Sequence, residues 1–157
     1  MSYPFLPTRL AEVQERIAAA CFRSGRDVSE VTLIAVTKTH PADAVTSVVS
    51  CGIQNIGENK VQELEAKVAE LGRDAARWHL IGHLQTNKVR RAVELADLIH
   101  TIDSLKLAAK VGEEAVARGV TVDALVQVNV GGEETKGGFE PDEALEGIGA
   151  ICQLQGI

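Results

Sequence analysis

The 157-residue sequence has few cysteines, no long hydrophobic run and no signal-peptide pattern at its start. Its three cysteines, Cys21, Cys51 and Cys152, are far apart and form no Cys-x-x-Cys pair. This spacing argues against a disulfide framework or a zinc site and favours a reducing compartment. Because no apolar run is long enough to span a bilayer, we expect a cytoplasmic protein without a membrane partner.

Clustered positive charge is also scarce. The formal net charge is −6 at pH 7, and the basic residues gather only in short groups such as residues 88–91. Such a group is typical of a solvated helix face, whereas binding to a phosphate backbone needs many clustered Lys and Arg side chains. We therefore expect no nucleic-acid partner. The 45% hydrophobic and 24% charged composition is typical of one globular domain.

After a first amphipathic helix from Leu6 to about Cys21, the sequence repeats one unit: a short apolar strand, a polar loop and an amphipathic helix. The strands are expected at residues 31–36, 53–56, 78–81, 98–102 and 124–130. Proline or a capping residue opens the expected helices, and glycine closes three of them: they start at Pro41, Asn59, Ser104 and Pro141 and end at Gly52, Gly72 and Gly119.

Strands that are apolar on both faces and separated by single helices predict a parallel α/β sheet with helices outside it. A doubly wound sheet usually has a glycine fingerprint after its first strand, but residues 37–41 contain no glycine. We therefore predict a TIM-type (β/α) barrel, with about five of its eight βα units in a single domain over residues 1–157. We expect this chain alone to be poorly folded, or to associate through its open strand edges.

Barrel chemistry takes place at the C-terminal ends of the strands, and Lys38 is the sharpest candidate there. It follows a wholly apolar strand, so partial desolvation would favour the neutral amine that Schiff-base formation with an aldehyde requires. The alternative is a lysine that merely extends into solvent from a strand end.

Asn59 and His83 follow the next two strands. Asn59 could contact a ligand, but the residues themselves favour a cap of the helix that follows, which alone would explain it. His83 could point into the barrel mouth, whereas His79 fits a core or strand-facing position. The sequence has no His-Glu-x-x-His motif, so we expect no metal site. The glycine-rich stretch 131–138 fits a mobile surface loop better than a phosphate cradle.

These motifs resemble the pyridoxal phosphate homeostasis proteins, which look like the barrel domain of alanine racemase without its second domain. The match covers residues 35–41, 57–63, 78–88, 100–103 and 126–138 in the family's order. The resemblance implies a barrel of the pyridoxal-5′-phosphate (PLP) fold-type III class. It also implies PLP on Lys38 as a Schiff base, Asn59 near the cofactor ring and His83 in the segment that lines the mouth.

The resemblance further implies a non-catalytic PLP carrier that serves intracellular PLP homeostasis as a monomer or weak homo-oligomer. The alternative is a racemase-type PLP enzyme, which needs an acid–base group on each face of the ring. The only tyrosine, Tyr3, precedes the barrel, and Lys38 is the one obvious base. A third possibility, a Schiff-base aldolase without PLP, usually has its lysine on a later strand. In the family, the phosphate-holding loops follow the part of the barrel present here, so we expect weak PLP binding.

Overall fold

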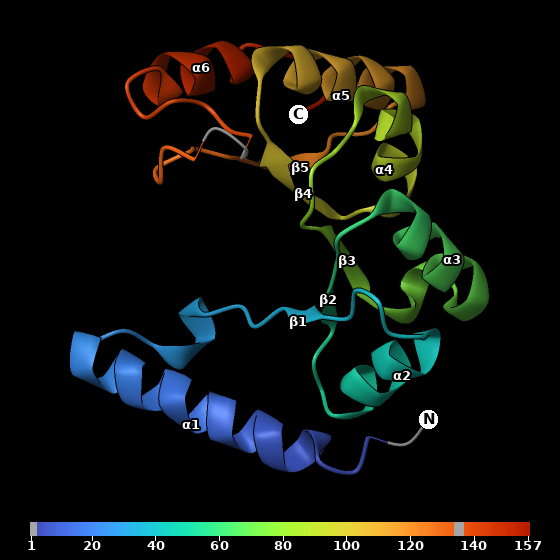
Figure 1. Cartoon of the computed structure of the whole chain (residues 1–157), viewed down its shortest axis with the longest axis vertical. Helices are drawn as coiled ribbons and strands as arrows, with labels where there is room; N and C mark the ends of the chain where they lie inside the picture. Colours follow the sequence, from blue (N-terminus) through green and yellow to red (C-terminus); the bar gives the residue numbers. More distant parts are fainter. Residues whose placement is uncertain (1–2, 134–136) are drawn as a thin grey trace.

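The computed structural model describes residues 3–133 and 137–157, and these residues form a parallel sheet with helices on its outer side (Figure 1). The sheet has five strands in the order β1-β2-β3-β4-β5, every neighbouring pair being parallel. The strands are β1 (Ala35–Val36), β2 (Asn55–Glu58), β3 (Arg77–Leu80), β4 (Leu98–Ile102) and β5 (Asp123–Val126).

The helices alternate with these strands. They are α1 (Leu6–Ser24), α2 (Ala42–Ser50), α3 (Val61–Leu71), α4 (Val89–Leu95), α5 (Leu105–Arg118) and α6 (Ala144–Ile151), with short 3-10 helices at Val28–Glu30, Arg73–Ala75 and Thr86–Lys88. Figure 1 shows α2 to α6 following the outer side of an arc whose inner side carries the strands. A strictly sequential order is that of a barrel, because a doubly wound sheet reverses direction at a switch point. The predicted partial (β/α) barrel is confirmed.

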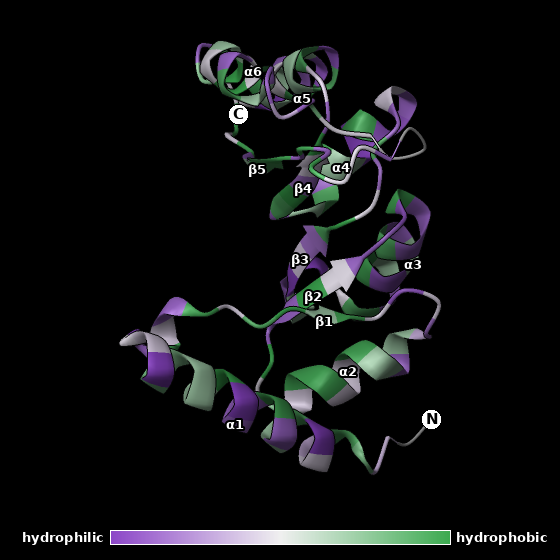
Figure 2. Ribbon diagram, turned by 60° about the vertical axis from the view of Figure 1, so that its left-hand side comes forward, coloured by the Kyte–Doolittle hydropathy of each residue, from purple (hydrophilic) through white to green (hydrophobic). Residues whose placement is uncertain are grey.

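The two faces of the sheet differ in burial. Ile56, Trp78 and Leu80 are fully buried on the face that the helices cover. In Figure 2 hydrophobic colour is clear on α2 and β4, whereas β3 is largely hydrophilic in colour. On the opposite face Val36 and Leu125 remain 47% and 49% exposed. The helix-covered face therefore contains the core, whereas the inner face of the arc is partly open to solvent.

The first strand is shorter than the sequence predicts. Residues 31–36 are apolar except for Thr32, yet only Ala35 and Val36 are in the ladder, paired with Ile56 and Gly57. The partner strand β2 begins at Asn55, which in this register lies opposite Ile34, so β2 offers residues 31–33 no pairing positions. An apolar run thus predicts which segment forms the strand, but it does not predict at which residue the hydrogen bonds to the neighbouring strand begin. Likewise β5 ends at Val126 rather than at residue 130.

Helix α4 is not among the helices that the sequence analysis places. It has only seven residues, and its buried side chains are Val89, Ala92, Val93 and Leu95. The basic group at 88–91 contributes its solvated face: Arg91 donates to Glu65 on α3 at 2.5 Å and to Glu94 at 2.6 Å. The apolar residues of α4 are interrupted by Arg90, Arg91 and Glu94, so the sequence does not show a clear amphipathic pattern here.

Several helix boundaries agree with the sequence. The hydroxyl of Ser104 accepts the amide of Leu107 at 3.3 Å and so caps α5, while Gly72 and Gly119 end α3 and α5. Helix α6 starts at Ala144 rather than at Pro141. Residues 134–136 of the glycine-rich stretch, predicted to be a mobile loop, lie outside the described residues. No helix within 3–133 or 137–157 is long and apolar enough to cross a membrane.

Candidate functional site

Lys38 lies in the turn that directly follows β1, at the C-terminal edge of the sheet. Its side chain is exposed, and among the described residues no hydrogen bond or ion pair is found for its amine. The backbone around it is fixed: the amide of Thr37 donates to the carbonyl of Gly57 at 3.1 Å, and Thr39 has a φ of 64°. A primary amine is therefore held at a strand end and is accessible to a ligand.

Asn59 and His83 lie together in one pocket at the ends of the two neighbouring strands, β2 and β3. The pocket has a volume of about 680 Å³ and is lined by Asn59, Lys60, Val61, Gln62, Glu63, His83, Gln85 and Lys88. Lys38 is outside this lining, but Glu63, which is part of it, accepts the amide of Thr39 at 2.8 Å. The three residues predicted from the sequence therefore lie along one edge of the sheet.

The loops that carry Asn59 and His83 are in tight contact. A Cβ atom placed on Gly82 would lie 2.1 Å from the carbonyl oxygen of Asn59 and 2.5 Å from its Oδ1. Only glycine fits at such a distance. The predicted cap is wrong, because α3 begins after Lys60 and no described side chain caps it. Asn59 instead packs against the loop after β3.

His83 is oriented by a carboxylate from the next strand. Its Nδ1 lies 3.0 Å from Oδ2 of Asp103, which follows β4, and the hydroxyl of Ser104 donates to Oδ1 of the same residue at 3.1 Å. The side chain of His83 is 68% exposed, whereas that of Asp103 is 14% exposed. The pairing leaves Nε2 of His83 directed away from the carboxylate and available to a ligand.

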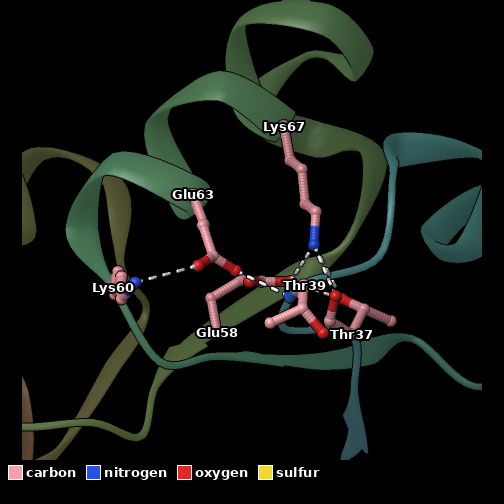
Figure 3. A network of polar contacts seen from close by, with 6 residues as sticks. All are labelled: Thr37, Thr39, Glu58, Lys60, Glu63 and Lys67. Carbon is pink, nitrogen blue, oxygen red and sulfur yellow. Dashed lines mark hydrogen bonds and ion pairs between the residues drawn. The ribbon is translucent and has the colours of Figure 1, made fainter.

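A buried ion pair lies next to the Lys38 turn, and sequence reasoning missed half of it. Glu58 ends β2 and Lys67 belongs to α3, and both side chains are buried (Figure 3). Lys67 looks like a surface residue in the sequence. One feature of the sequence could have predicted its burial. Lys67 lies between Leu64 and Leu71, beside the apolar stripe of α3, and a lysine at such a position is buried only when an acidic side chain pairs with it.

The inner face of the sheet carries a second polar group, away from the pocket. His79 belongs to β3 and is 2% exposed, so of its two expected positions the strand-facing one is confirmed. Its Nδ1 lies 2.9 Å from Nε2 of His100, and its Nε2 lies 2.9 Å from Oδ1 of Asn55. Burial, and then the neighbouring His100, lower the pKa of His79, and burial lowers the pKa of His100. Neutral rings that hydrogen-bond to each other are the favoured state.

Tyr3 lies near the Lys38 turn, although it precedes the barrel in the sequence. Its ring meets that of His40 edge-on, with 6.3 Å between the centroids. His40 is two residues from Lys38. Among residues 3–133 and 137–157, no group of three or more His, Cys, Asp or Glu could hold a metal ion. The chemistry available at this edge is therefore that of an amine, an amide and an oriented imidazole, a donor set that suits an aldehyde with polar substituents.

A family model of the alanine racemase N-terminal domain matches residues 10–157 of the chain. A curated pyridoxal phosphate homeostasis protein from Aquifex aeolicus is 42% identical over 138 residues, covering 88% of this chain and 60% of the relative. The protein of the same name from Escherichia coli is 39% identical over 148 residues, covering 92% and 63%. The chain thus spans about three fifths of the length of these relatives.

Solved structures agree with these matches. The crystal structure of a protein from Bifidobacterium adolescentis, described as unknown, has a TM-score of 0.86 at 36% identity, covering 96% of this chain and 65% of that one. PipY from Synechococcus elongatus, solved with PLP bound, has a TM-score of 0.74 at 39% identity, covering 91% and 65%. The resemblance seen in the sequence is confirmed, and the chain belongs to the alanine racemase N-terminal domain family.

Proposed function

We propose that this protein binds PLP as a Schiff base on Lys38 and serves intracellular PLP homeostasis without turning over a substrate. The observation that carries the proposal is the exposed Lys38 amine, at the same sheet edge as a pocket lined by Asn59 and His83. The names of the curated relatives and the PLP-bound structure of PipY support it. We place the protein in the cytoplasm as a monomer or weak homo-oligomer.

The residues at this edge fit such a ligand. The Lys38 amine would add to the aldehyde carbon, a C–N bond would form, and the carbonyl oxygen would leave as water. Asn59 and His83 offer hydrogen bonds to the polar ring substituents, and the ammonium groups of Lys60 and Lys88 suit an anion. The pocket volume of about 680 Å³ lies within the usual range for small-molecule sites. Bound PLP would supply an electron sink, but a carrier needs only the covalent hold.

The absence of turnover in this proposal rests on the acid–base groups. Racemisation needs one such group on each face of the cofactor ring. Lys38 is the one obvious base at the strand ends, and the sole tyrosine, Tyr3, precedes the barrel in the sequence. The curated relatives are named for PLP homeostasis, which supports a carrier.

A racemase-type enzyme acting on amino acids is the second candidate, and one observation favours it. Asp103 holds Nδ1 of His83 at 3.0 Å, an arrangement that orients an imidazole for acid–base work. His83 would then be the second acid–base group that racemisation requires in addition to Lys38.

The covalent link is tested by borohydride reduction of the PLP-loaded protein followed by peptide mapping. We expect the pyridoxyl group on Lys38, and we expect Lys38→Ala to lose the absorbance of the Schiff base. Lys106→Ala, which removes an exposed lysine of α5, serves as the matched control and should behave like the unaltered protein. A Lys38→Ala protein with its full Schiff-base spectrum would refute the proposal.

Optical rotation separates the two candidates. The loaded protein is incubated with L-alanine, and the carrier proposal predicts no change in rotation above a protein-free control. Steady racemisation that both Lys38→Ala and His83→Gln abolish would favour the enzyme instead.

A further inference from the structure

The residue before Lys38 is held by a buried network (Figure 3). The carbonyl of Thr37 accepts a hydrogen bond from Nζ of Lys67 at 2.7 Å, and the same Nζ donates to Oε1 of Glu58 at 2.5 Å. The hydroxyl of Thr37 donates to that carboxylate oxygen as well. The side chains of Lys67 and Glu58 are 7% and 0% exposed. Thr37 is therefore fixed through both its backbone and its side chain.

The residue after Lys38 is held from the same helix. The amide of Thr39 donates to Oε2 of Glu63 at 2.8 Å. Thr39 has a φ of 64°, in the left-handed region that β-branched residues rarely adopt. A charged acceptor for its amide offsets this cost and selects the turn. Helix α3 thus supplies one contact on each side of Lys38, from Lys67 to Thr37 and from Glu63 to Thr39.

Stability alone does not account for the buried pair. Well-packed apolar side chains in place of a buried ion pair usually leave a fold as stable or more so, because both charges lose their water. In addition, among the described residues Glu58 Oε2 is buried without a hydrogen-bond partner. An apolar pair could not hold the carbonyl of Thr37 at a fixed place.

We propose that Lys67 and Glu63 are positioning residues that set the direction of the Lys38 side chain through the backbone of its two neighbours. The inference rests on the proposed function, since it concerns how Lys38 meets PLP. It assigns to helix α3 a role in fixing the backbone at Lys38 before the ligand arrives, so that only side-chain freedom of Lys38 is lost on binding.

Glu63 allows the sharpest test, because Gln keeps a side-chain oxygen that can accept the Thr39 amide and Ala does not. The full chain is compared with its Glu63→Gln and Glu63→Ala variants, and with Glu70→Ala, an exposed glutamate of the same helix, as the control. Two readouts are used: hydrogen exchange of the Thr39 amide without PLP, and PLP affinity from the Schiff-base absorbance.

We expect Glu63→Ala to speed exchange of the Thr39 amide about tenfold and to weaken PLP binding roughly threefold to tenfold, as the loss of one partly exposed charge-assisted hydrogen bond implies. Glu63→Gln should lie close to the unaltered protein and Glu70→Ala should match it, with similar thermal unfolding throughout. Unchanged exchange in Glu63→Ala would overturn the inference. Equal PLP affinity in Glu63→Ala would do the same.

The buried pair is tested with a double variant, since removing one charge alone would leave the other buried. Glu58→Gln with Lys67→Met removes both charges and preserves the side-chain volumes approximately. We expect a folded protein whose PLP affinity is at least about threefold lower, because the Thr37 carbonyl has lost its donor. A folded double variant with undiminished affinity would remove Lys67 from the inference. If the unaltered protein takes up no PLP on Lys38, the proposed function itself fails. That result is distinct from a variant whose affinity equals that of a PLP-binding unaltered protein, which overturns only the positioning role.

Discussion

Replacement of Gly82 by alanine adds a single methyl group, yet it should lower both the stability of the protein and its affinity for PLP. The new Cβ would lie 2.1 Å from the carbonyl oxygen of Asn59 and 2.5 Å from its Oδ1, far inside contact distance. Gly82 is buried, and its own carbonyl accepts a hydrogen bond from the hydroxyl of Thr101 at 2.7 Å. Because Thr101 holds Gly82 from β4, the loop that carries Asn59 must move instead.

The magnitude follows from this geometry. Overpacking of a well-packed region costs about 1–3 kcal/mol, and backbone atoms, which relax less easily than side chains, place Gly82→Ala in the upper half of that range. For a chain of this size, each kcal/mol lowers the melting temperature by about 2–4 °C. We therefore expect a loss of roughly 4–12 °C. If Asn59 also loses one hydrogen bond to PLP, the affinity falls about threefold to tenfold.

Thermal unfolding and PLP titration of the same preparations measure both effects. Gly149→Ala is the matched control, because it adds the same methyl group in α6 at a position where, apart from its chain neighbours and the nearby backbone of its own helix, no described atom lies within 4 Å. A helical Gly-to-Ala change should raise stability by about 0.5–1 kcal/mol and leave PLP affinity alone. A Gly82→Ala protein as stable as the unaltered one, with equal PLP affinity, would refute the reasoning.

Two further predictions concern the framework around the site. Because burial lowers the pKa of His79 and His100 below the ordinary value of 6.5, the folded chain favours neutral rings. The free energy of unfolding should be constant above about pH 7.5 and decrease as the pH falls from 6.5 toward the lowered folded values, since the unfolded chain then binds more protons. Urea unfolding from pH 8 to 5 checks this, and an equally steep decline in His100→Asn would contradict it. Asp97 accepts Arg73 through two bonds, of 3.0 and 2.6 Å, and also the amide of Trp78 at 2.6 Å. Asp97→Ala should cost about 2 kcal/mol in urea unfolding, whereas removal of the exposed Glu12 partner of Arg9 should not be detectable; equal losses would count against it.

The order of elements could be read from the sequence because each βα unit carries its own pattern. Five apolar runs, each followed by a polar strand end, gave the parallel sheet and put Lys38, Asn59 and His83 at one edge of it. This prediction needs only the periodicity of single segments and the rule that parallel strands end on the same side.

The pairings between units could not be read in the same way. The contact of Asn59 with Gly82, the orientation of His83 by Asp103 and the burial of Lys67 against Glu58 all join residues from different segments. These contacts depend on how the loops are placed relative to one another, to within a few tenths of an ångström. The periodicity of single segments does not determine that placement. For the same reason Asn59 was expected to cap α3, although its backbone is engaged by the neighbouring loop.

The network around Lys38 is also local along the chain, which bears on how the protein is made. Its longest contact, from Lys67 to Thr37, spans 30 residues, and the others span 21, 24 and 9. At ribosomal rates of about 5–20 residues per second, the whole set leaves the ribosome within roughly 1.5–6 s. The entropic cost of closing such loops grows only slowly with their length, and none of these contacts uses a residue that follows Lys67. All four contacts join residues within 37–67. Exchange of this segment as a unit between related chains would therefore transfer the contacting residues together, whereas a junction inside it would separate Thr37 from Lys67.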